Sequence, residues 1–353
     1  MQVMNRYFLP KTGWEFFDVS RAYGVGVIVH TLSGDAVVSD MGGLYLIESQ
    51  RELNFERIDQ IHKFFGDDQA WDWTFITIGS GQREKTKKKV VEFLGNVEDI
   101  RNILDGLKEL KSPVYIGSGK ETLYQPMELA ATKGIRDEIL LKKQYSEGSP
   151  VKVSISDFTL SVLGHINATI RKFSNMGMIF AIPSPTRTRI LHLIGEIRKR
   201  IDDSVKGLHR AGWFPSLAQI AVNLVLEELR VEEGGKFAPK FGSLIYGVMT
   251  KTGNQWKPLT GGIFPLDLLH QIAESNEAIK VLNKWKDIFE WTAFRKGYED
   301  LPSALAEFIT NPSLSNYERY IKLHLRNDIG KDRIKFGSYE EKVLKEVVNF
   351  VGV

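Results

Sequence analysis

The sequence predicts an α+β protein in which a body with several short strands precedes a helical C-terminal region. Short apolar runs typical of strands fall mostly in the first two-thirds of the 353 residues, between segments with helical spacing. Beyond residue 262 the pattern is almost wholly helical, and turn pairs such as Asn311-Pro312 separate the helices. We therefore expect an α+β N-terminal domain over 1–262 and a helical C-terminal domain over 263–353.

The first expected element is mainly helical and covers 13–32. This segment is apolar, carries Gly24 and Gly26 two residues apart, and is followed by Ser33-Gly34, where the helix should end. Glycines inside a buried helix allow a neighbouring backbone to approach closely. A strand over 23–30 is the alternative. In either case we expect the role of this segment to be structural.

Strands are expected where short apolar runs are bounded by turn residues. A hairpin over 36–48 should turn at Met41-Gly42-Gly43, where a positive φ favours glycine. A second hairpin over 244–259 should turn at Thr252-Gly253-Asn254. The other expected strands are 73–79, 114–117, 138–142, 151–155 and 178–182.

The clearest expected helix covers 187–209, with Pro185 upstream and Gly212 downstream as boundary signals. Its apolar residues recur at steps of three and four, which places them on one face. They are Ile190, Ile194, Ile197, Ile201, Val205 and Leu208. The other expected helices are 53–65, 97–110, 157–173, 216–231, 265–275, 277–295, 302–310, 313–326 and 339–350.

Composition is that of an ordinary folded protein, with 42% hydrophobic and 26% charged residues and a net charge of +3. The chain has no cysteine, which excludes disulfides, iron–sulfur clusters and cysteine-containing zinc sites. No cleavable apolar leader is visible, and the longest apolar runs are too short to span a bilayer. We therefore expect a cytoplasmic protein.

Motifs for catalysis are missing. Tyr23-Gly24-Val25-Gly26 lacks the third glycine of a dinucleotide fingerprint, and Gly119-Lys120 lacks the flanking residues of a Walker loop. No two of the seven histidines have the spacing of a local metal motif, and no G-x-S-x-G sequence occurs. We expect neither an enzyme nor a cofactor. A metal-dependent nuclease with ligands dispersed along the chain stays open as an alternative.

Positive charge is concentrated between residues 171 and 210, where Lys and Arg outnumber Asp and Glu by six. The entry to the expected helix at 187 combines threonine hydroxyls, guanidiniums and free backbone amides, groups that favour phosphate. The candidate nucleic-acid contacts are Arg187, Arg189, Lys199, Arg200, Lys206 and Arg210. A basic, solvated helix is the alternative.

A second basic cluster follows a glycine-rich stretch. Its candidate contacts are Lys85, Lys87, Lys88 and Lys89. A lysine run after Gly79-Ser80-Gly81 is typical of a mobile loop that follows a nucleic-acid backbone without reading bases. A solubilising surface loop is the alternative.

Four stretches near the N-terminus carry a resemblance to a known family. They are Gly13-Trp14-Glu15-Phe16-Phe17-Asp18-Val19, Arg21-Ala22-Tyr23-Gly24-Val25-Gly26, Gly34-Asp35 and Asp40-Met41-Gly42-Gly43-Leu44-Tyr45. This region resembles the N-terminal region of the archaeal Csa-type large subunit of the type I-A CRISPR interference complex (Cascade). The resemblance is specific over this region and general over the rest of the chain.

The resemblance implies a non-catalytic subunit that binds the guide RNA handle and target DNA. It also implies recognition of the protospacer-adjacent motif, help in opening the duplex, and contacts with the small subunit and the helicase–nuclease components. By position alone, Asn175 and Gln82 are the expected base-edge contacts. Besides the nuclease, a purely protein-binding scaffold whose basic patches meet acidic partners is the remaining alternative.

Overall fold

The computed structural model describes residues 5–64, 68–76, 80–109, 119–122, 152–174, 177–204, 207–231, 237–253, 255–275, 277–327 and 341–345. Its contacts cluster into two units, each made of three segments of chain. The N-terminal unit comprises Met1–Thr169, Phe180–Arg198 and Ile245–Gly262. The C-terminal unit comprises Ile170–Ile179, Lys199–Leu244 and Ile263–Val353. The division expected at residue 262 stays a prediction.

The expected α+β class is confirmed, with antiparallel strands toward the N-terminus and helices in the C-terminal half. The first sheet lies in the N-terminal unit and has four antiparallel strands. In spatial order these are β1 (Asn5–Pro10), β3 (Leu44–Ser49), β2 (Val37–Asp40) and β8 (Arg187–Arg189).

The first helix is confirmed and the alternative strand over 23–30 is wrong. Helix α1 spans Glu15–Ser33 and ends at Gly34, whose φ of 78° is the left-handed conformation of a helix C-cap. The hairpin is also confirmed: β2 and β3 are joined by a turn in which Gly42 has a φ of 82°. Almost every residue of α1 is buried, because neighbours cover it on several sides.

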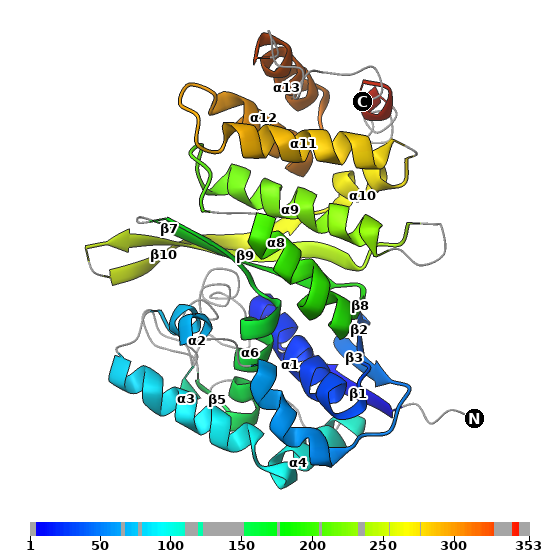
Figure 1. The fold of residues 1–353 in the computed structure, drawn as a ribbon, viewed down its shortest axis with the longest axis vertical. Helices are drawn as coiled ribbons and strands as arrows, with labels where there is room; N and C mark the ends of the chain where they lie inside the picture. The colour runs from blue at the N-terminus through cyan, green and yellow to red at the C-terminus, as the bar shows by residue number, and fades with distance from the viewer. Residues whose placement is uncertain are drawn as a thin grey trace. The chain divides into compact units, whose positions relative to one another are not determined.

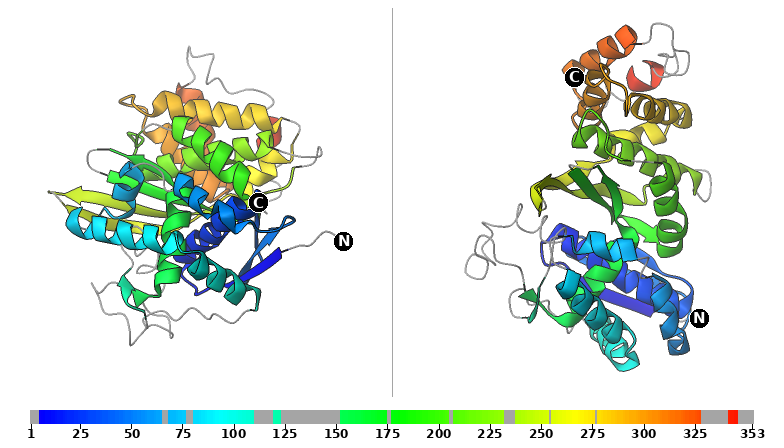
Figure 2. Two further views of the ribbon diagram at one scale, coloured as in Figure 1. Left: turned by 60° about the horizontal axis from the view of Figure 1, so that its bottom comes forward. Right: turned by 60° about the vertical axis from the view of Figure 1, so that its left-hand side comes forward.

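The principal neighbour of α1 is helix α6 (Ile155–Ala168), which lies beside it (Figures 1 and 2). A Cβ atom added to Gly24 would lie 2.0 Å from the carbonyl oxygen of Leu160. One added to Gly164 would lie 1.8 Å from the carbonyl oxygen of Ser20. The two backbones touch, so each glycine fills a position that no other residue type can occupy without a shift.

A buried ion cluster ties α1 to α6 and to the preceding loop. The Arg21 guanidinium contacts Asp18 at 3.1 Å and Asp157, at the start of α6, at 2.9 Å. Asp18 also accepts hydrogen bonds from the backbone amides of Thr12 and Gly13. Asp18 and Arg21 belong to the stretch that carries the family resemblance, and their role in the structure is to hold this corner of the fold together.

Three helices and a 3₁₀ segment complete the N-terminal end of the chain. They are η1 (Phe55–Phe64), α2 (Asp68–Thr74), α3 (Ser80–Leu94) and α4 (Val97–Lys108). The strand expected over 73–79 is wrong at its described residues, because Trp73 and Thr74 end α2 and a turn follows. Short strands β4 (Glu121–Thr122) and β5 (Lys152–Val153) pair with each other.

The helix expected over 187–209 begins later than its sequence pattern suggests. Residues 187–189 form β8 because they pair with β2, and helix α7 (Ile190–His192) starts directly after them. The π-helical segment η2 (Leu193–Ile197) and helix α8 (Arg198–Ser204) continue it. Its expected apolar face is confirmed at Ile190, Ile197 and Ile201, which are buried.

The second sheet has the spatial order β10, β9, β7, β6. These strands are β10 (Gln255–Pro265), β9 (Phe241–Thr252), β7 (Gly177–Pro185) and β6 (Ile170–Phe173). The expected hairpin at 244–259 is confirmed, with Gly253 at a φ of 59° in its turn. The helix expected over 157–173 is too long, because α6 ends at Ala168 and β6 follows.

The C-terminal unit is mainly helical. Its helices are α9 (Trp213–Arg230), α10 (Asp267–Ala273), α11 (Ala278–Thr292), α12 (Asp300–Thr310) and α13 (Leu314–Asn327). An aromatic cluster of Trp285, Phe308 and Tyr320 joins α11, α12 and α13. Of the helix expected over 339–350, residues 341–345 are described and helical. The strands expected at 114–117 and 138–142 lie outside the described residues.

Among the helices that the structure describes, none combines the length and apolarity needed to cross a membrane.

Gly164→Ala should strongly destabilise the protein, because the added methyl group meets backbone atoms of α1 rather than a flexible side chain. We expect a loss of about 3 kcal/mol in the free energy of unfolding, measured by urea denaturation. Gly81→Ala is the matched control, since Gly81 is also helical but has nothing within 4 Å of its Cβ position. Equal stabilities of the two variants would contradict the close contact between α1 and α6.

Candidate nucleic-acid interface

The lysine run lies on a helix, so the mobile loop expected there is wrong. Helix α3 forms because Thr86, Val90 and Leu94 recur every four residues and are buried on one side. Lys85, Lys88 and Lys89 are exposed. Helix α3 is labelled in Figure 1. We call the exposed surface made by Lys85, Lys88 and Lys89 the lysine face of α3.

The lysines of α3 make weak surface interactions. Lys88 Nζ lies 3.7 Å from Glu92, and Lys89 Nζ lies 3.0 Å from Glu121. Lys87 Nζ, which is half-buried, sits 5.7 Å from the centre of the Trp71 ring. An exposed ion pair contributes about 0–1 kcal/mol. A phosphate can therefore replace these carboxylates at little cost. Gln82, one turn earlier, is exposed on the same helix.

The phosphate site expected at the entry to the helix over 187–209 stays a prediction. Arg187 and Arg189 directly precede helix α7, and Arg189 is its N-cap residue. They lie on strand β8, and Thr188 between them is buried, which removes its hydroxyl from the surface. Residues two apart on a strand point to the same side of the sheet. Both arginines are exposed, on the opposite side from Thr188.

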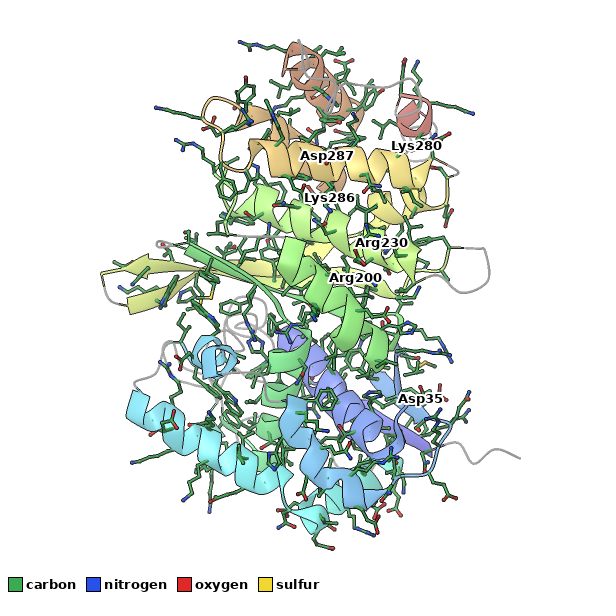
Figure 3. The ribbon with its side chains drawn as sticks, in the orientation of Figure 1. Asp35, Arg200, Arg230, Lys280, Lys286 and Asp287 are labelled. Atoms are coloured by element: carbon green, nitrogen blue, oxygen red, sulfur yellow. The ribbon has the colours of Figure 1, made fainter. Side chains whose placement is uncertain are left out.

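The other candidate contacts expected between residues 171 and 210 belong to the C-terminal unit, so they are described separately from Arg187 and Arg189. Arg200 contacts Glu227 at 3.0 Å, and Arg230 contacts the same carboxylate. Both arginines are labelled in Figure 3. Arg210 contacts Glu299 at 3.0 Å. Lys199 is exposed. Lys206 and Asn175 lie outside the described residues.

The turn between α11 and α12 is a basic and aromatic surface that the sequence reasoning missed. The Arg210 amide donates a hydrogen bond to the Ala293 carbonyl, which places Arg210 next to this turn. Phe294 is 70% exposed, and Arg295 and Lys296 beside it are exposed too. The signal was an aromatic residue followed by Arg-Lys-Gly between two helical patterns. This signal was overlooked because Phe294 and Arg295 fell inside the helix expected over 277–295.

The C-terminal unit also holds a buried polar cluster. Lys172 is fully buried, its Nζ donates a hydrogen bond to Gln219 at 2.6 Å, and burial lowers its pKa well below the usual value. His209 Nδ1 accepts a hydrogen bond from the Ala211 amide. Its Nε2 lies 3.0 Å from Thr292 Oγ1, which donates to the Ile288 carbonyl, so His209 is neutral with its proton on Nε2.

This cluster could supply an amine and an imidazole, but both are engaged in holding core elements together. Burial first, and the nearby Lys172 second, lower the pKa of His209 to about 4. A catalytic acid or base works best when its pKa lies near the working pH. A histidine with a pKa so far below 7 therefore suits a structural hydrogen bond better than acid–base chemistry. Within the described part of the chain, no group of three or more His, Asp or Glu side chains could hold a metal ion. No family model matches the sequence.

His209 should make the stability depend on pH. Its pKa is about 4 in the folded chain and near 6.5 when unfolded, so between these values only the unfolded chain takes up a proton. Stability should therefore fall as the pH drops from 7 to 4, by on the order of 3 kcal/mol from this residue.

Urea denaturation at a series of pH values measures this effect. His209→Gln keeps one donor and one acceptor without a titrating ring, and should have a shallower dependence between pH 4 and 6.5. Identical slopes in the wild type and the variant would show that His209 is protonated in the folded state.

Proposed function

We propose that this chain is a non-catalytic nucleic-acid-binding subunit of a CRISPR effector complex. The observation that carries the proposal is the lysine face of α3, where Lys85, Lys88 and Lys89 are exposed on one regular helix. The resemblance of residues 13–45 to the large subunit of the type I-A complex supplies the class of assembly. Guide RNA and target DNA are the proposed ligands.

Lysines on a helix suit contact with the phosphate backbone. Each is a flexible point charge that can pair with a phosphate without demanding a fixed geometry. Such contacts release counterions and carry no sequence information, so binding depends strongly on salt and little on sequence. In an RNA-guided complex, phosphate contacts without sequence information are sufficient, because base pairing with the guide reads the target and the protein reads only a short motif.

The finer parts of the proposal follow from the family. The subunit would recognise the protospacer-adjacent motif, help to open the duplex, and contact the small subunit and the helicase–nuclease components in the cytoplasm. The position of Gln82 on α3 agrees with a base-edge contact beside the phosphate-binding lysines. The exposed Lys199 and the ion-paired Arg200 and Arg210 are further candidate phosphate contacts.

Replacing the lysine face tests the proposal. Lys85→Gln, Lys88→Gln and Lys89→Gln together should weaken binding to target duplexes of every sequence, measured at several salt concentrations with the protein in its co-purified assembly with guide RNA. If all three contact phosphates, the slope of log K against log salt should fall by about 3.

The matched control removes three exposed lysines elsewhere: Lys257→Gln, Lys280→Gln and Lys322→Gln. It should leave the slope unchanged. A wild-type slope in the α3 variant would remove this helix from the interface. Full assembly with partner subunits, but no affinity for nucleic acid in any variant or in the wild type, would instead make the chain a protein-binding scaffold.

A further inference from the structure

The first sheet has one buried face and one face that is partly open to solvent. Along β1, Tyr7 and Leu9 are buried, while Arg6 is exposed and Phe8 is half-buried. On β8, Thr188 is buried between the two exposed arginines. On the outward side of β3 and β2, Leu46 and Val37 are half-buried, whereas Glu48 and Ser39 are buried. Successive side chains of a strand point to opposite faces. The outward residues therefore share one surface, which we call the open face.

The strand register places the outward residues in two rows. Arg6 lies opposite Glu48, Glu48 opposite Val37, and Val37 opposite Arg189. In the next row Phe8 lies opposite Leu46, Leu46 opposite Ser39, and Ser39 opposite Arg187. Arginines therefore stand on both edge strands. Between them lie the half-buried apolar side chains of Phe8, Leu46 and Val37, together with the buried Glu48 and Ser39.

The carboxylate of Glu48 lies between two arginines on this face. The side chain of Glu48 is only 10% exposed, and its two oxygens face different arginines. Arg6 Nε donates to Oε1 at 3.1 Å, and Arg187 Nη1 lies 4.0 Å from Oε2. Since a guanidinium has five N–H donors, both arginines keep donors for a second, anionic partner. Two cations that share one carboxylate leave an excess of positive charge.

An apolar centre with basic edges selects the kind of partner. Phe8 presents part of an aromatic ring at the surface, and a base can stack on it only if the base is unpaired. Arginine contacts phosphates bidentately and can lie flat on bases. A duplex offers phosphates but keeps its bases stacked inside, so a single strand fits this surface better.

We propose that the open face binds single-stranded nucleic acid, with Phe8 stacking on a base and with Arg6, Arg187 and Arg189 contacting phosphates. This site rests on the proposed function and extends it, because it differs from the lysine face of α3 in position and in ligand. Helices α1 and α6 pack between the sheet and α3, so the two surfaces lie on different sides of the N-terminal unit (Figure 1).

Fluorescence anisotropy with labelled oligonucleotides of equal length tests the proposal on the full chain, using uridine-rich RNA and the corresponding DNA. Arg187→Gln with Arg189→Gln should weaken single-strand binding at least tenfold. Arg51→Gln with Arg57→Gln is the matched control, because these exposed arginines lie on other segments of the same unit, and it should bind as the wild type does.

Phe8 tests the stacking itself. Phe8→Ala should weaken binding about 5- to 100-fold. Because a half-buried residue also contributes to folding, Phe8→Trp is the second variant. It keeps an aromatic face, should retain affinity, and should show stronger tryptophan quenching on binding than the wild type with its seven tryptophans.

The outcomes separate the two sites. Single-strand binding that survives in the α3 lysine variant, but is lost in the β8 variant, supports the open face even if α3 proves irrelevant to duplexes. Weaker binding of DNA than of RNA identifies RNA as the ligand, and the reverse identifies DNA. The proposal is overturned if the β8 and Phe8→Ala variants bind both oligonucleotides as the wild type does. It is also overturned if these variants lose a partner protein while retaining oligonucleotide binding.

Discussion

The contact between the backbones of α1 and α6 is the constraint on which the N-terminal unit depends. Gly24 and Gly164 bring the two helices so close that the backbone of one touches the other. At this separation the ion cluster of Arg21, Asp18 and Asp157 also closes, since its members come from both helices. A larger residue at either glycine would separate the helices and disturb the buried charges together, which makes this contact a cooperative element of the fold.

The same helix positions the open face. A Cβ atom on Gly26 would lie 2.6 Å from the Ile190 side chain and 2.9 Å from that of Val38, so α1 fits directly against β2 and the residue that follows β8. The backbone of Ile190 donates to the Ala36 carbonyl at 2.9 Å, which fixes the end of β8 beside the start of β2. The orientation of Arg187 and Arg189 thus follows from how tightly α1 packs. The glycines of the apolar stretch thus determine, through packing, where this surface lies.

The sequence predicted those helices and turns that are determined by residues close together in the chain. The apolar run with Ser33-Gly34 behind it predicted α1, and Met41-Gly42-Gly43 predicted the first hairpin, because the left-handed φ of Gly34 and of Gly42 is a property of the turn itself. The four-residue spacing of Thr86, Val90 and Leu94 also indicates a helix at the lysine run. The preceding glycines and the lysines themselves suggested a loop instead.

Pairing between distant segments was invisible in the sequence. Arg187-Thr188-Arg189 continues a helical pattern, yet it forms a strand because β2, about 150 residues earlier, offers a free edge. For the same reason no local pattern indicated that Glu48 would lie between Arg6 and Arg187. The basic residue types of the candidate interface could therefore be named from the sequence, whereas the surface that they share could not.

Ultraviolet cross-linking followed by mass spectrometry of peptides is the most direct test of the central claim, that this chain contacts nucleic acid through the N-terminal unit. The protein would be irradiated in its co-purified assembly with guide RNA and bound target. The account predicts cross-linked peptides from α3 (Ser80–Leu94), from β1 (Asn5–Pro10) and from the segment around β8 (Arg187–Arg189). Efficient cross-linking of partner subunits, with none in these three segments, would contradict it.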